Sequence, residues 1–139
     1  MHRYEVSKLL EVLLVRELVS RINASKSPSP HVTITLVNPG LCNTGLARDP
    51  KENSLAIRLT GALVLFLIGR TAEVGGRTLV LGAAAGEESH GEYMSDGENQ
   101  EVEKWIYRDV GRKAQQKVWE QTMGVLEERS PGLAKKVGI

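Results

Sequence analysis

The chain is poor in the residues on which several classes of protein depend. Its 139 residues include one cysteine, Cys42, which excludes an intrachain disulfide framework and a zinc site built from several thiolates. Aromatic residues make up 4%, too few for the stacking platforms that bind single-stranded nucleic acid. The 18 Lys and Arg residues nearly balance the 17 Asp and Glu residues, so we expect no basic surface for nucleic acid or an anionic membrane.

Long apolar runs and an N-terminal secretory signal are also missing. The most apolar stretch, 55–68, contains Arg58 and is shorter than the roughly 20 residues that cross a bilayer. We expect it to form a buried helix or a lid, in a cytoplasmic chain without a membrane span. The histidines, at positions 2, 31 and 90, are too scattered in sequence to predict a metal site.

The apolar pattern predicts a single domain of the α/β class. Four helices are expected, over 4–22, 54–70, 72–85 and 102–128. The first has apolar residues at i, i+3, i+4 and i+7 spacing from Val6 onward. A run rich in β-branched residues predicts a strand over 31–37, and a short second strand is expected at 91–94. Two strands do not make a stable open sheet on their own, so the chain is expected to be helix-rich and incomplete as a sheet.

Two groups of residues could carry chemistry, and the first is Tyr4 with Lys8. The two lie four positions apart, which places them one turn apart on one face of the predicted helix. An ammonium beside a phenol favours the phenolate, so the pair could transfer a proton near neutral pH. The same spacing arises by chance on many helices, where the lysine stem lies along the ring. From the pair alone, proton transfer and simple packing both stay open.

The second group follows the predicted strand over 31–37. The segment 38–44, NPGLCNT, places Pro-Gly at the carboxyl end of that strand, where open α/β sheets bind their ligands. Gly40 allows the backbone to approach a ligand closely, and the loop amides with the Thr44 hydroxyl could hold a carboxamide or a phosphate. An ordinary connecting loop is the alternative. The Cys42 side chain is expected to be a small apolar filler rather than a nucleophile.

Together, these groups resemble the short-chain dehydrogenase/reductase family. The matching features are Tyr4 and Lys8 as YxxxK, the helix after them, the strand and turn VTITLVNPG, and Thr44. Downstream, 90–94 looks like the family's final Gly-x-Tyr strand, and 117–120 is similar to retinol-dehydrogenase-like and fungal members. The likeness covers nearly the whole chain. It implies the carboxyl-terminal portion of a Rossmann-type, doubly wound parallel sheet.

The resemblance also implies roles for particular residues. Tyr4 would exchange a proton with the substrate oxygen, and Lys8 would favour its phenolate and hold the ribose hydroxyls beside the nicotinamide. Further cofactor contacts would come from Pro39, Gly40, the backbone of Cys42, and Thr44. The stretch 46–70 would be the substrate lid. The ancestral reaction would then be an NAD(P)-dependent interconversion of a carbonyl and an alcohol.

The family's dinucleotide-binding half and its catalytic serine have no counterpart in the sequence, since three residues precede Tyr4. We therefore expect a truncated chain that binds NAD(P) weakly or not at all, because the helix N-terminus that holds the pyrophosphate is missing. The helix over 4–22 and the strand over 31–37 lack neighbours. This predicts self-association or a partner chain that covers both.

Three functions stay open at this point. The chain could be part of a short-chain oxidoreductase, or a cofactor-independent isomerase or cyclase that uses Tyr4 and Lys8. It could also be a non-catalytic module that binds other chains. Whether the chain is itself an enzyme is therefore open, as is the identity of any small-molecule substrate.

Overall fold

The computed structural model describes residues 3–25, 32–44 and 55–137, with the backbone alone for 55–58 and 137. Within these ranges, the α-helices are Arg3–Ala24 (α1), Leu55–Ile68 (α2), Ala72–Ala84 (α3), Asp109–Arg129 (α4) and Leu133–Val137 (α5). The strands are Leu36–Asn38 (β1), Tyr93–Ser95 (β2) and Glu98–Gln100 (β3). Two short 3₁₀-helices are Glu87–Ser89 (η2) and Lys104–Tyr107 (η3).

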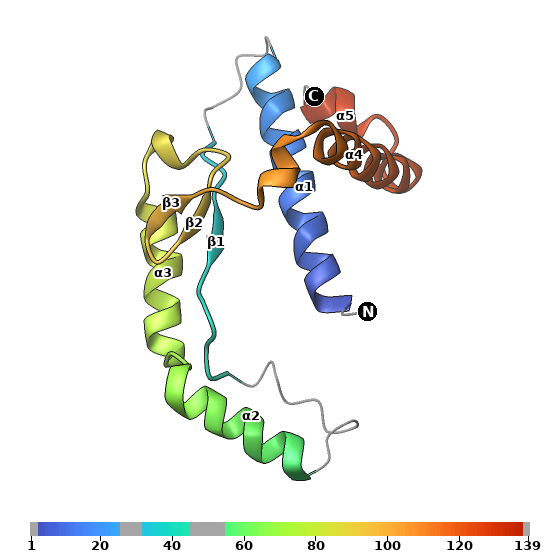
Figure 1. Ribbon diagram of the computed structural model, residues 1–139. Coiled ribbons are helices and arrows are strands. Elements are labelled where there is room, and N and C mark those ends of the chain that lie inside the picture. Colours follow the sequence, from blue (N-terminus) through green and yellow to red (C-terminus); the bar gives the residue numbers. More distant parts are fainter. Residues whose placement is uncertain (1–2, 26–31, 45–54, 138–139) are drawn as a thin grey trace.

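A small mixed sheet lies at the centre, with strand order β1-β2-β3 (Figure 1). β1 and β2 are parallel, and the helices α2 and α3 lie between them in the chain, as parallel neighbours require. β2 and β3 form an antiparallel hairpin. Its turn contains Asp96 and Gly97, both with positive φ, which is the conformation that favours Asp-Gly. The predicted class, α/β and helix-rich with few strands, is confirmed.

Helices lie on both sides of the sheet. Figure 1 shows α3 on one side of the strands and α1, with α4 crossing it, on the other. Gly82 of α3 faces Val37 of β1 so closely that a Cβ at position 82 would overlap the Val37 side chain. The apolar core is small and consists of Leu13, Val19, Met94, Ile106 and Trp119.

The contact between α1 and α4 contains a buried carboxylate. Glu17 accepts hydrogen bonds from Arg21 Nε at 2.8 Å and from Gln115 Nε2 at 2.9 Å. The Arg21 guanidinium also lies over the Trp119 ring, 4.8 Å from its centre. A buried carboxylate is tolerated only when such partners satisfy it, so Glu17 fixes how the two helices cross.

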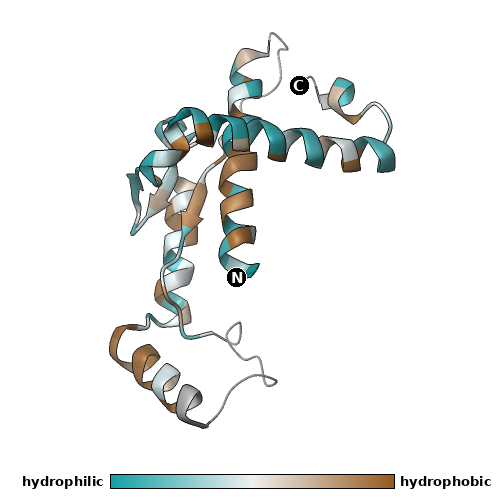
Figure 2. Ribbon diagram, turned by 45° about the vertical axis from the view of Figure 1, so that its right-hand side comes forward, coloured by the Kyte–Doolittle hydropathy of each residue, from teal (hydrophilic) through white to brown (hydrophobic). Residues whose placement is uncertain are grey.

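The helix α2 extends away from the rest of the fold, so of the two expectations for this stretch, a buried helix or a lid, the buried helix is wrong. Its side chains are mostly exposed from Leu59 onward, and Phe66 is 84% exposed. Figure 2 shows the helix as an apolar segment beside the tip of α3. None of the described helices combines the length and apolar character needed to cross a membrane. The start of the expected lid, 46–54, lies outside the described residues.

The strands and the last helix differ from their predicted bounds. Of the strand expected over 31–37, residue 31 lies outside the described residues, and regular pairing begins only at Leu36. Just before it, the Ile34 amide donates to the side-chain atom Nδ1 of His90, not to a neighbouring backbone. The helix expected over 102–128 begins at Asp109, because Arg108 is extended and η3 precedes it. Trp105 and Trp119 are therefore not on one helix.

Candidate active site

The first two turns of α1 bring Tyr4 and Lys8 together. The Lys8 ammonium lies 5.9 Å from the centre of the Tyr4 ring, as the spacing predicts for one helical face. Tyr4 is 60% exposed, so its phenol is accessible to a ligand. The hydroxyl of the nearest serine in sequence, Ser7, donates to the Tyr4 carbonyl oxygen at 2.7 Å. Ser7 is therefore engaged by the helix backbone and does not take the place of the family's catalytic serine.

Sequence reasoning missed a third member of this group, Glu11. Its carboxylate lies 3.0 Å from the Lys8 ammonium, and this hydrogen bond is the main reason that the pKa of Lys8 is raised above its ordinary value. Lys8 consequently stays protonated at neutral pH and loses its charge only above the usual lysine range. The i, i+3 spacing of Lys8 and Glu11 on the same helix was the signal that could have revealed the pair.

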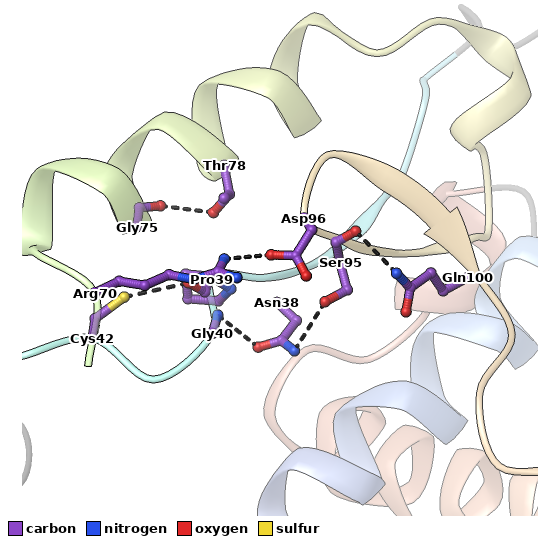
Figure 3. Close-up of polar contacts among 10 residues, drawn as sticks. All are labelled: Asn38, Pro39, Gly40, Cys42, Arg70, Gly75, Thr78, Ser95, Asp96 and Gln100. Atoms are coloured by element: carbon purple, nitrogen blue, oxygen red, sulfur yellow. Dashed lines mark hydrogen bonds and ion pairs between the residues drawn. The ribbon is translucent and has the colours of Figure 1, made fainter. Parts of the chain in front are cut away.

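The loop after β1 adopts a conformation that requires glycine. Gly40 has a φ of 76°, in the left-handed region. Its amide donates to Asn38 Oδ1 at 3.0 Å, while Asn38 Nδ2 donates to Ser95 Oγ at 3.4 Å (Figure 3). One asparagine side chain thus connects the turn at Gly40 to the end of β2 and holds the loop in this conformation.

Cys42 fills space between the loop and α3. Its thiol donates weakly to the Pro39 carbonyl oxygen at 3.4 Å, and it packs against Gly75 of α3 (Figure 3). A Cβ at Gly75 would overlap the sulfur, so the glycine allows the helix and the loop to touch. The helix α3 still begins at Ala72, because the Thr71 hydroxyl caps it by accepting from the Val74 amide at 3.2 Å.

Arg70, which sequence reasoning also missed, supports the other side of the loop. Its amide donates to the Leu41 carbonyl oxygen at 2.7 Å, and its carbonyl oxygen accepts from the Asn43 amide at 2.9 Å. Its guanidinium is paired with Asp96 in the turn between β2 and β3, which raises the pKa of Arg70 further (Figure 3). No local sequence pattern marks this contact, because the partners come from three separate segments.

The two groups lie at the same end of the fold. Figure 1 shows the N-terminus of α1 and the end of β1 pointing in the same direction on one side of α3. Within the described residues, no hydrogen bond or ion pair joins the Tyr4–Lys8 pair to the loop. In the same residues, no group of three or more His, Cys, Asp or Glu side chains is arranged to hold a metal ion.

Comparison with known proteins identifies the family. The short chain dehydrogenase/reductase dmxR8 of a Cryptosporiopsis species is 42% identical over 130 residues, which is 94% of this chain and 37% of that protein. The short-chain dehydrogenase anuD of Penicillium roqueforti is 37% identical over 94% of this chain and 34% of its own length. The short chain dehydrogenase atnD of Emericella nidulans is 46% identical over 68% of this chain. No family model and no solved structure gives a significant match.

The chain belongs to the short-chain dehydrogenase/reductase family. It spans about a third of the length of the curated relatives it matches. The resemblance drawn from the sequence is therefore confirmed at the level of the family. The relatives' names state no substrate for this chain and assign no role to its individual residues.

Short-chain dehydrogenases/reductases generally use NAD(P), and the loop fits the nicotinamide end of that cofactor. Among the described residues, no atom accepts a hydrogen bond from the backbone amides of Leu41 and Cys42. Two free N–H groups on a glycine-containing loop suit a carboxamide oxygen, which accepts hydrogen bonds. Two of the three glycines of α3, Gly75 and Gly82, pack against Cys42 and Val37, so these two do not face a pyrophosphate.

Proposed function

We propose that the chain carries the proton-transfer pair and the nicotinamide-facing loop of an NAD(P)-dependent carbonyl/alcohol oxidoreductase. The observation that supports this most is the contact between the exposed Tyr4 phenol and the Lys8 ammonium, at the end of the fold where the loop presents its free amides. Lys8 would also hold the nicotinamide ribose. The loop contacts would come from Pro39, Gly40, Cys42 and Thr44.

In this proposal each residue has a defined task. When bound, the reduced cofactor supplies the hydride that adds to the carbonyl carbon. Tyr4 donates its phenolic proton to the carbonyl oxygen, and it accepts the proton back when the alcohol is oxidised. The neighbouring Lys8 charge stabilises the phenolate left after transfer, and solvent restores the proton because the phenol is exposed. Glu11 moderates the Lys8 charge through its hydrogen bond.

The experiment that tests this proposal uses half of the cofactor. The loop and Lys8 would contact the nicotinamide half alone, so reduced nicotinamide mononucleotide should bind the chain nearly as well as NADPH does. ADP-ribose, which lacks the nicotinamide, should not bind. Saturation-transfer NMR measures all three affinities. Lys8→Met should weaken binding of the mononucleotide, and Lys113→Met on α4 serves as the matched control. The proposal would be contradicted if the chain binds NADPH but not the mononucleotide, or if it binds neither compound.

We further propose that a second copy of this chain or a partner chain covers β1 and α1. β1 is an edge strand of the described sheet. The Leu36 amide donates to the Glu92 carbonyl oxygen, directly before β2, so the Val37 amide faces the open side. A groove of about 230 Å³ runs beside it, lined by Thr33, Thr35, Val37, Gly82, Ala83 and Ala85. Val6 and Leu10 expose an apolar strip on α1. Such edges and strips are typical of interfaces.

Light scattering combined with size exclusion tests this assembly. We expect a dimer or a larger defined species for the purified chain alone if a second copy is the occupant. The double variant Val6→Lys with Leu10→Lys should shift the mass toward the monomer. The control Val125→Lys, an exposed valine on α4, should leave it unchanged. A monodisperse monomer that captures no partner chain would contradict the proposal.

A further inference from the structure

Arg70 joins three segments that are far apart in the sequence. Its backbone forms a parallel bridge with the loop at Cys42, through the hydrogen bonds to Leu41 and Asn43. Its side chain is paired with Asp96 in the turn between β2 and β3. The arginine therefore fixes the loop relative to the sheet, at the point where the chain passes from α2 to α3 (Figure 3).

The guanidinium also lies directly against the glycine turn. A Cβ placed on Gly40 would come within 3.3 Å of the Arg70 guanidinium carbon, so the two are in contact with no room between them. The Asn38 side chain holds the Gly40 amide and reaches Ser95. The turn is thus tied to the β2–β3 hairpin twice, through Asn38 to Ser95 and through Arg70 to Asp96.

The backbone hydrogen bond from Arg70 sets the direction of one of the free amides. The Leu41 carbonyl and the Cys42 N–H belong to the same peptide group, which is planar, with its oxygen and hydrogen on opposite sides. Because the Leu41 oxygen accepts from the Arg70 amide, the Cys42 N–H points away from Arg70. Within the described residues, nothing accepts from it there. Any rotation of this peptide would break the bond to Arg70 and turn the N–H elsewhere.

We propose that Arg70, held by Asp96, is a positioning residue that keeps the Cys42 amide aimed at the nicotinamide carboxamide. The nicotinamide ligand in this inference rests on the proposed function. The hold that Arg70 and Asp96 have on the loop, called the clamp below, does not. Arg70 need not touch the cofactor, because it acts through the loop. Partly exposed ion pairs contribute little to global stability, so the effect of losing the pair should be local to residues 40–44.

The experiment compares Arg70→Met, Asp96→Asn and Arg70→Lys with the wild-type chain. Arg77→Met is the matched control, because Arg77 forms an exposed ion pair with Glu73 on α3 that does not reach the loop. Amide hydrogen exchange by NMR reports the clamp without any ligand. We expect the Asn43 and Arg70 amides to exchange about two- to fivefold faster in Arg70→Met and Asp96→Asn, the factor that a typical ion pair corresponds to. Arg70→Lys should retain part of the protection, and Arg77→Met all of it.

Titration with reduced nicotinamide mononucleotide then separates the clamp from the proposed function. The dissociation constant should rise in Arg70→Met and Asp96→Asn and should stay unchanged in Arg77→Met. Unchanged exchange in Arg70→Met and Asp96→Asn would overturn the clamp. Faster exchange with unchanged affinity would overturn its positioning role. If exchange is faster in the two variants but the wild-type chain does not bind the mononucleotide, the result would support the clamp and refute the proposed function. If Arg70→Met fails to fold, Asp96→Asn decides the matter, since it leaves Arg70 in place.

Discussion

Replacing Gly75 by alanine is expected to destabilise the fold by about 1–3 kcal/mol, the usual cost of forcing an extra methyl group into a packed contact. The added Cβ would overlap Cys42 Sγ, and the position is buried between α3 and the loop. Either the helix or the loop must shift, so the substitution should also displace the residues proposed to face the nicotinamide. Urea unfolding followed by circular dichroism measures the change in the free energy of unfolding.

The neighbouring glycine provides a matched control. No atom lies within 4 Å of a Cβ at Gly76, so Gly76→Ala should stabilise α3 by about 0.5–1 kcal/mol, the difference in helix propensity. Adding Cys42→Ala to Gly75→Ala should recover much of the lost stability, because the remaining contacts, to the Cβ atoms of Cys42 and Pro39 at 3.6 Å, are ordinary. Equal effects of the two glycine substitutions, or additive effects in the double variant, would show that the contact is not close.

Under the proposed function, Tyr4→Phe is expected to reduce the turnover of a carbonyl substrate about 10²–10⁴-fold, the typical contribution of a general acid. The substitution removes the transferable proton and keeps the ring. Because Tyr4 is 60% exposed, the free energy of unfolding should change by less than about 0.5 kcal/mol. Consumption of NADPH, followed by its absorbance, measures turnover.

A second tyrosine supplies the control for this prediction. The Tyr107 hydroxyl accepts a hydrogen bond from the Val102 amide and lies in η3, away from α1's first turn. Tyr107→Phe should therefore lower stability slightly and leave turnover unchanged. Retained turnover in Tyr4→Phe, with NADPH still consumed at the wild-type rate, would show that proton transfer does not depend on the Tyr4 phenol.

The helices were the most predictable part of the fold. The apolar spacing gave α1 and α3 nearly to the residue, and in the structure the Thr71 hydroxyl caps the start of α3. β3 was missed because Glu98, Asn99 and Gln100 are polar and show no apolar alternation. The Asp-Gly turn before it was the available signal. The start of α4 was misjudged because apolar residues continue at helical spacing through η3, while the extended backbone at Arg108 interrupts the helix.

In the candidate site, contacts between residues close in sequence were predictable, and contacts between distant segments were not. The approach of Tyr4 and Lys8 follows from helix geometry, so sequence spacing was enough to predict it. The roles of Arg70 and Asp96 depend on a loop, a helix end and a hairpin meeting in space, which no local pattern encodes. The close packing of Gly75 on Cys42, which leaves no space for a side chain, is also a contact between residues far apart in the sequence.

The central claim is that one ligand, the nicotinamide end of NAD(P), contacts both the first two turns of α1 and the loop after β1. The most direct measurement is a map of backbone amide shifts by NMR as reduced nicotinamide mononucleotide is added to the chain. We predict shifts in both segments, 4–8 and 38–44, with the largest at the Cys42 amide. Shifts in neither segment, or in only one of them, would contradict the claim that these residues form one nicotinamide site.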